Sequence, residues 1–151
     1  MKGIVKFFAL ALATFGAQMI STSAMAQVTA PPSGTYSGIV DVKKGLAFKC
    51  NLGLTVNATS STVAVSLTPG NPACASLSFV GNPYSYTFDS TTGDFTVVGV
   101  YVNTITAGNC TGNITATWDD TTNEFLISTT LPGGLVNGTP TPDCFIEGTA
   151  S

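Results

Sequence analysis

Apolar and polar residues alternate through the stretch AFKCNLGLTV at residues 47–56. The large apolar side chains occupy every second position, at Phe48, Cys50, Leu52, Leu54 and Val56. Because successive side chains of a β-strand point to opposite faces, this pattern predicts a strand with one buried face and one exposed face. Nothing after residue 26 has the length and 3.6-residue period of an amphipathic helix. The alternation therefore indicates an all-β protein.

Similar segments recur along the chain, separated by turn-forming clusters such as PGNP and STTG. Further strands are predicted at Thr35–Val42, Thr62–Leu67, Ser76–Val80, Tyr84–Phe88, Phe95–Val102, Ile114–Trp118, Glu124–Thr130 and Cys144–Thr149. About eight or nine short antiparallel strands in one chain of this size favour a β-sandwich with Greek-key or jelly-roll order. A small closed barrel is the alternative.

The first 26 residues are predicted to be a signal peptide. Two lysines in Met1–Lys6 precede the apolar run Phe7–Ala17, and Ala24-Met25-Ala26 fits the small-x-small rule for cleavage. The apolar run is shorter than the ~20 residues that a bilayer-spanning helix needs. We expect cleavage after Ala26, and a mature chain that is secreted or held at the cell surface without a transmembrane segment. It would have a flexible segment at 27–34 and a single disulfide-stapled domain at 35–151.

Charge excludes several classes of function. After residue 26 the chain has three lysines against eight acidic residues, a formal net charge of −5, and neither Arg nor His. Nucleic acid is excluded as a partner, because neutralising phosphates requires clustered cations. Without His there is no Ser or Cys triad, so the protein is not expected to be an enzyme or to carry a cofactor.

Four cysteines in an exported chain predict two disulfides. A hairpin turn at Asn57–Thr62 would place residue 50 across the ladder from about residue 71, close to Cys74. The expected pairs are therefore Cys50–Cys74 and Cys110–Cys144. A structural zinc site is not expected, because the chain has no CxxC pair and no His.

Two stretches thirty positions apart match each other: TFDSTTGDF at 87–95 and TWDDTTNEF at 117–125. As a metal site, the second copy would offer oxygen ligands from Asp119, Asp120, Asn123 and Glu124. It lacks the ligand spacing of known calcium loops. As a hydrolytic pair, Asp119 and Asp120 would point to opposite sides of an extended chain. A calcium-dependent or hydrolytic site at 119–124 is therefore only an alternative.

We interpret the repeat as one hairpin turn used twice. Asp89 and Asp119 would accept hydrogen bonds from backbone N–H groups two or three residues later. Gly93 and Asn123 would occupy the position that needs a positive φ. On this interpretation Gly93→Val damages folding, and Asp120→Ser, which restores the other copy's residue, is nearly silent.

The surface suggests association. Charged residues make up only 9% of the chain, and few lysines are left to guard sheet edges. The segment VVGVYV at 97–102 is apolar at nearly every position, as in a strand buried on both faces or a contact surface. We expect self-assembly through β edges, or contact with surfaces or apolar ligands. The alternative is a carrier of an alkane or lipid, which needs a cavity of roughly 300 Å³ or more.

The chain resembles one known family. The segments concerned are the leader, KKGLAFKCNLGLTV at 43–56, ACASLSF at 73–79, the glycine-valine strand, AGNCTGNITATWDDTTNEF at 107–125 and DCFIEGTAS at 143–151. Together they look like the PraB family, exported proteins called activators of alkane oxidation. The resemblance implies a secreted or surface-associated bacterial protein linked to growth on hydrocarbons, biofilm matrix or adhesion. It carries over no catalytic residues.

Overall fold

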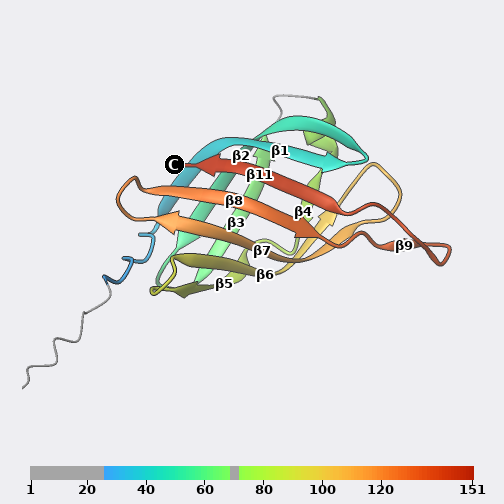
Figure 1. The fold of residues 1–151 in the computed structure, drawn as a ribbon. Helices are drawn as coiled ribbons and strands as arrows, with labels where there is room; N and C mark the ends of the chain where they lie inside the picture. Colours follow the sequence, from blue (N-terminus) through green and yellow to red (C-terminus); the bar gives the residue numbers. More distant parts are fainter. Residues whose placement is uncertain (1–25, 69–71) are drawn as a thin grey trace, which may run out of the picture.

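Eight antiparallel strands close into a ring in the computed structural model, which describes residues 26–68 and 72–151 (Figure 1). The predicted signal peptide therefore lies outside the described residues, apart from Ala26. In ring order the strands are β1 (Gly34–Lys44), β2 (Leu46–Asn57), β3 (Thr62–Thr68), β5 (Tyr84–Asp89), β6 (Asp94–Asn103), β7 (Cys110–Asp119), β8 (Glu124–Leu131) and β11 (Cys144–Ala150).

Three short strands lie outside the ring. Strand β4 (Ser78–Val80) pairs with the last residues of β6, and β9 (Leu135–Val136) forms a hairpin with β10 (Thr139–Pro140). The one helix in the described ranges is a 3₁₀ turn at Pro72–Ser76. No helix in residues 26–68 or 72–151 is long and apolar enough to cross a membrane.

The fold is all-β and antiparallel as expected, but the predicted sandwich is wrong, because the sheet closes into a barrel. Strand β6 pairs with both β5 and β7, and β1 pairs with both β2 and β11, so each ring strand has two neighbours. Glycines permit a close approach at the β1–β11 pair. A Cβ on Gly38 would lie 1.8 Å from Thr149 O, and one on Gly148 would lie 2.3 Å from Ile39 O.

The ring closes most narrowly between β3 and β5, which share only two residue pairs. Beyond them the side chain of Asn82 takes the place of a strand. Its Oδ1 accepts a hydrogen bond from Val65 N at 2.9 Å, and its Nδ2 donates to Val65 O at 2.9 Å. A side-chain amide thus extends the ladder where β5 no longer reaches β3.

The barrel has two ends, which we name by their connections. The turn end carries the hairpin turns at 58–61, 90–93 and 120–123 and the N-terminal segment. The loop end carries the β1–β2 turn, the loop at 104–109 and the connection at 132–143 that holds β9 and β10. In Figure 1 the described N-terminal segment lies at the left and β9 at the right.

Aromatic rings dominate the core near the turn end. Phe125 contacts Tyr36, Phe95 and Trp118 with ring centroids 4.6–5.0 Å apart, and Tyr86 stacks on Phe95 at 4.3 Å. Such pairs stabilise beyond the area they bury, by about 0.5–1.5 kcal/mol each.

Disulfides join the pairs that were expected: Cys50 to Cys74 and Cys110 to Cys144. The first ties β2 to the 3₁₀ turn. The second ties the starts of β7 and β11 together at the loop end.

Candidate interaction surfaces

The repeated sequence forms the β5–β6 and β7–β8 turns. Asp89 Oδ1 accepts a hydrogen bond from Thr91 N at 2.8 Å. In the second copy Asp119 Oδ1 accepts from Thr121 N at 2.8 Å and Thr122 N at 3.3 Å. These two backbone N–H groups hold the pKa of Asp119 below its ordinary value, because they stabilise the charged carboxylate. Both aspartates therefore act as local caps of a turn.

The proposed calcium ligands have other roles. Asp120 Oδ2 accepts a hydrogen bond from the distant Thr29 N at 2.6 Å, and Asn123 takes a positive φ of 56°. Glu124 begins β8 and pairs in register with Asp119. Within residues 26–68 and 72–151, no three His, Cys, Asp or Glu side chains form a group that could hold a metal ion.

The two turns touch each other through their backbones. Trp118 N donates to Gly93 O at 2.8 Å, and a Cβ on Gly93 would lie 2.8 Å from Trp118 O. The φ of Gly93 is +79°. Position 93 therefore needs glycine for two reasons, its positive φ and its close contact with the neighbouring turn. At position 123 only the positive φ applies, which Asn can adopt.

Residues 27–33, which we call the N-terminal strap, cross both turns. Val28 N donates to Ser90 O at 2.8 Å in the first turn. Thr29 N donates to the Asp120 carboxylate in the second, and Trp118 Nε1 donates to Thr29 O at 2.9 Å. The segment that was expected to be flexible is thus hydrogen-bonded to both copies of the repeat.

The strap also contributes buried surface. Pro31 is fully buried, and Val28 packs against the core. Tyr36 Oη donates to Pro32 O at 2.8 Å. Because Asp120 binds the strap through its side chain while Ser90 uses its backbone carbonyl, the two positions are not equivalent. Asp120→Ser is therefore expected to loosen the strap, not to be nearly silent.

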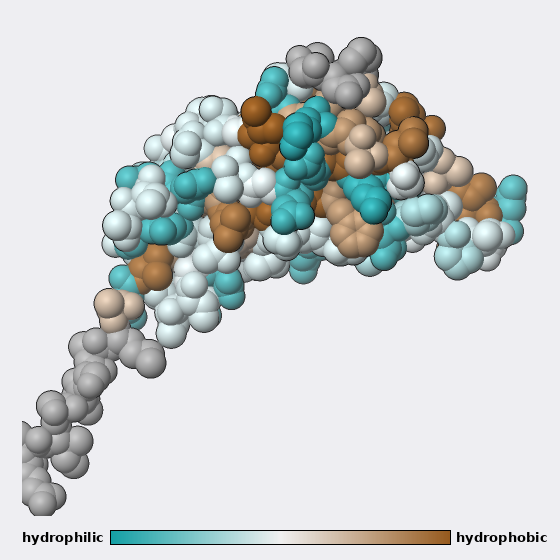
Figure 2. All heavy atoms as spheres, turned by 45° about the horizontal axis from the view of Figure 1, so that its top comes forward, coloured by the Kyte–Doolittle hydropathy of each residue, from teal (hydrophilic) through white to brown (hydrophobic). Residues whose placement is uncertain are grey.

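The loop end exposes large apolar side chains. Leu46 is 67% exposed, Ile105 62% and Leu135 68%. Val136 and Phe145 are exposed on the same end. These five residues define what we call the apolar end. Leu46 and Ile105 help to line a small, mostly apolar pocket of about 40 Å³. Figure 2 shows hydrophobic residues in brown among hydrophilic residues in teal, with a brown group at the right-hand end of the molecule.

A buried lysine lies beneath this end. Lys44 Nζ donates to Pro142 O at 3.1 Å and Thr141 Oγ1 at 3.4 Å, and lies 3.3 Å from Cys110 Sγ. Burial lowers the pKa of Lys44, and the carboxylate of Asp143 opposes that shift. The ammonium thus holds the 132–143 connection against the barrel. The sequence interpretation did not predict a buried lysine. The signal was present, because every second residue of β1 from Val40 faces inward and this alternation reaches Lys44.

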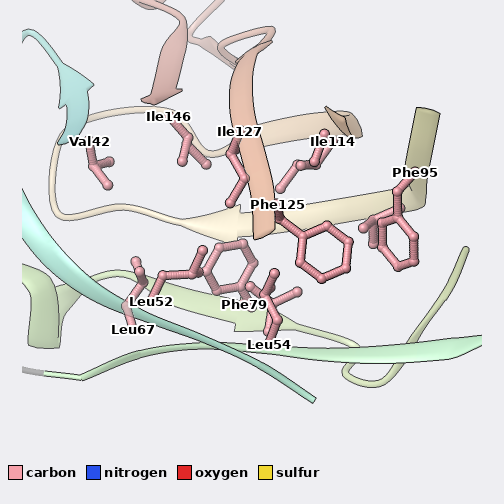
Figure 3. Close-up of a pocket in the computed structure, with 13 residues that line it drawn as sticks. Val42, Leu52, Leu54, Leu67, Phe79, Phe95, Ile114, Phe125, Ile127 and Ile146 are labelled. Atoms are coloured by element: carbon pink, nitrogen blue, oxygen red, sulfur yellow. The ribbon is translucent and has the colours of Figure 1, made fainter. Parts of the chain in front are cut away.

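The barrel interior is apolar and nearly filled. Figure 3 shows Phe79, Phe95 and Phe125 among the side chains that line a cavity of about 30 Å³. All thirteen lining residues are apolar. A cavity this small holds about one water-sized probe, so an alkane or lipid chain does not fit in this conformation. It is well below the roughly 300 Å³ that a carrier requires.

Comparison with known proteins identifies the family. The family model described as "Alkane oxidation protein activator PraA/PraB-like" matches residues 1–151. No curated protein and no solved structure matches the chain. The family resemblance found in the sequence is confirmed across its full length: the chain belongs to the PraA/PraB-like family of alkane oxidation protein activators.

Proposed function

We propose that this protein is exported, is not an enzyme, and works outside the cell by holding its apolar end against apolar surfaces. Its setting would be adhesion, biofilm matrix or growth on hydrocarbons. One observation carries the proposal: the loop end of the barrel exposes five large apolar side chains, among them Leu135 and Leu46, the two most exposed large apolar side chains of the described residues. Membership in a family of alkane oxidation activators fits contact with hydrocarbon.

The apolar end is built to keep its shape on contact. The Cys110–Cys144 disulfide ties together the strands that bound its loops, and Lys44 fastens the 132–143 connection. A preorganised surface loses little conformational freedom when it binds, so more of the gain from burying apolar area remains. Each fully buried Leu or Ile side chain contributes about 1.5–3 kcal/mol.

Two features support export. The protein has two disulfides, and disulfides form and persist in the oxidising compartments outside the cytoplasm. The predicted cleavage point after Ala26 also lies directly before the strap, which makes its first hydrogen bond at Val28. A mature chain beginning at Gln27 would therefore retain every strap contact.

The sequence suggested that copies associate by pairing of β edges. The closed ring leaves few unpaired strand edges for such pairing. A carrier role for the interior is not favoured by a cavity of about 30 Å³. Contact through the apolar end needs neither a free edge nor an interior space.

Adsorption at a hexadecane–water interface tests the proposal. The test variant is Leu46→Ser, Ile105→Ser and Leu135→Ser combined. The matched control is Ile39→Ser, Val98→Ser and Leu126→Ser combined, at barrel-wall positions that are 60%, 44% and 58% exposed. We expect the test variant to need at least about tenfold more protein for half-maximal coverage, since it loses three apolar contacts. An equal loss in both variants would show that adsorption has no preferred end.

A further inference from the structure

We propose that the N-terminal strap also docks on a second copy of the chain, joining two barrels through their turn ends. The receptor is the surface of the two repeated turns that the strap contacts, which we call the strap site. It offers the strap three partners: Ser90 O, the Asp120 carboxylate and the indole N–H of Trp118. This inference rests on the proposed function, because it supplies the way in which copies of an adhesion protein associate.

The strap is a segment that can be exchanged between copies without dismantling the barrel. Strand β1 begins at Gly34, so residues 27–33 take part in none of the ring's ladders. Undocking breaks the strap's own hydrogen bonds to Ser90, Asp120 and Trp118 and exposes Pro31, but it leaves the ladders of the ring intact, and a second copy offers the same strap site. Exchange of an identical element between protomers re-forms each broken contact and is therefore an economical route to a dimer.

The length and stiffness of the strap limit how the two copies can be arranged. Seven extended residues reach at most about 25 Å, and Pro31-Pro32 makes the strap stiff. The strap leaves the barrel at the turn end, and the strap site lies at the same end. A second copy must therefore present its own turn end, so the exchange is reciprocal and gives a two-fold symmetric, closed dimer.

Such a dimer places the two apolar ends at opposite poles. The strands run from one end of the barrel to the other, and residues of the apolar end all lie at the loop end. Each dimer would then contact two apolar surfaces at once and bridge them. The repeat also acquires a reason for its duplication, because one turn binds Val28 and the other binds Thr29.

Isotope-mixed photo-crosslinking of the mature chain, residues 27–151, tests the exchange. An unlabelled chain carries p-benzoylphenylalanine in place of Val28, whose side chain lies 3.7 Å from where a Gly93 Cβ would be. It is mixed with an equal amount of ¹⁵N-labelled chain without the photoprobe. Dimer and monomer are separated by size before and after irradiation, and the crosslinked peptides are weighed.

We expect about half of the strap crosslinks in the dimer to reach labelled peptides from residues 90–93 or 118–120, and none in the monomer. A dimer with crosslinks only to unlabelled peptides would show that another surface joins the copies. A chain that remains monomeric throughout would overturn the proposal as well.

A shortened hinge provides a second test. Deleting Pro32 and Ser33 strains the return of the strap to the strap site of its own chain, so the dimer fraction at equal concentration should rise at least tenfold. An unchanged dimer fraction in a folded variant would count against exchange. Adsorption through the apolar end does not use the strap. Failure of the mixed crosslinks would therefore leave the adsorption result intact, and loss of adsorption in the serine variants would leave the crosslinks intact.

Discussion

Gly93 allows the contact between the two repeated turns to be measured. The repeat suggests that Gly93→Asn is harmless, because Asn123 occupies the matching position at φ +56°. The structure predicts the opposite, since a Cβ on Gly93 would lie 2.8 Å from the backbone oxygen of Trp118. Gly45→Asn is the matched control. Gly45 has a φ of +74°, and a Cβ there would meet nothing within 4 Å.

The two substitutions share the cost of placing Asn at positive φ, which is small for this residue. Only Gly93→Asn adds the contact with a backbone atom that has no freedom to move aside. Relief of such overpacking costs about 1–3 kcal/mol. At about 4 °C per kcal/mol for a domain of this size, Gly93→Asn should melt about 4–12 °C below Gly45→Asn. Gly93→Val should be worse still, by the additional ~1–2 kcal/mol of a left-handed non-glycine residue.

Thermal and urea unfolding followed by the fluorescence of Trp118, the single tryptophan, provide the assay. The urea midpoints should fall in the same order as the melting temperatures. If Gly93→Asn and Gly45→Asn unfold together, the turns do not press on each other as described, and the account of the repeat is wrong.

Three further predictions concern the strap, the second disulfide and the buried lysine. Trp118→Phe keeps an aromatic ring but loses the donor to Thr29 O, so amide hydrogen exchange at residues 28–30 should speed up severalfold while the β1–β2 ladder stays protected. Replacing Cys110 and Cys144 by Ser should lower the unfolding free energy by about 4 kcal/mol, from the chain entropy of a 34-residue loop, as measured by urea unfolding. Burial lowers the folded-state pKa of Lys44, so the folded state holds fewer protons than the unfolded state as pH rises from that value towards 10.5. Wild-type stability should therefore gain relative to Lys44→Met across this alkaline range, and a difference independent of pH would contradict the burial of the charge.

The residues of a strand that face inward were predictable from sequence, whereas the closure of the sheet into a barrel was not. The alternation from Phe48 to Val56 matches the inward face of β2. Alternation tells which residues face inward, but a sandwich and a barrel use the same pattern. Closure depends on β6 pairing along both of its edges, which is a relation between distant strands.

The stretch VVGVYV shows how local geometry can mislead. It was expected to be a strand buried on both faces or a contact surface. In the structure the β6–β7 register shifts between Val97 and Val100, and Gly99 has a φ of +68°. This bulge interrupts the alternation of inward and outward side chains, so Val97 and Val100 both point inward while Val98 is exposed. One buried face with a bulge therefore resembles two buried faces in sequence.

The candidate surfaces were only partly predictable. Local caps such as Asp119 follow from the residues beside them. The bond from Thr29 to Asp120 joins residues 91 positions apart, and nothing in either neighbourhood indicates it. The apolar end likewise gathers Leu46, Ile105 and Leu135 from three separate connections, which only the closed ring brings to one end.

The most direct test of the central claim is hydrogen exchange of the mature protein adsorbed on hexadecane droplets, read peptide by peptide by mass spectrometry. Contact through the apolar end predicts slower exchange in the connections at 44–46, 104–109 and 133–139 on adsorption. The turns at 58–61, 90–93 and 120–123 should exchange as they do in solution. Protection confined to those turns, or spread evenly over both ends, would contradict the account.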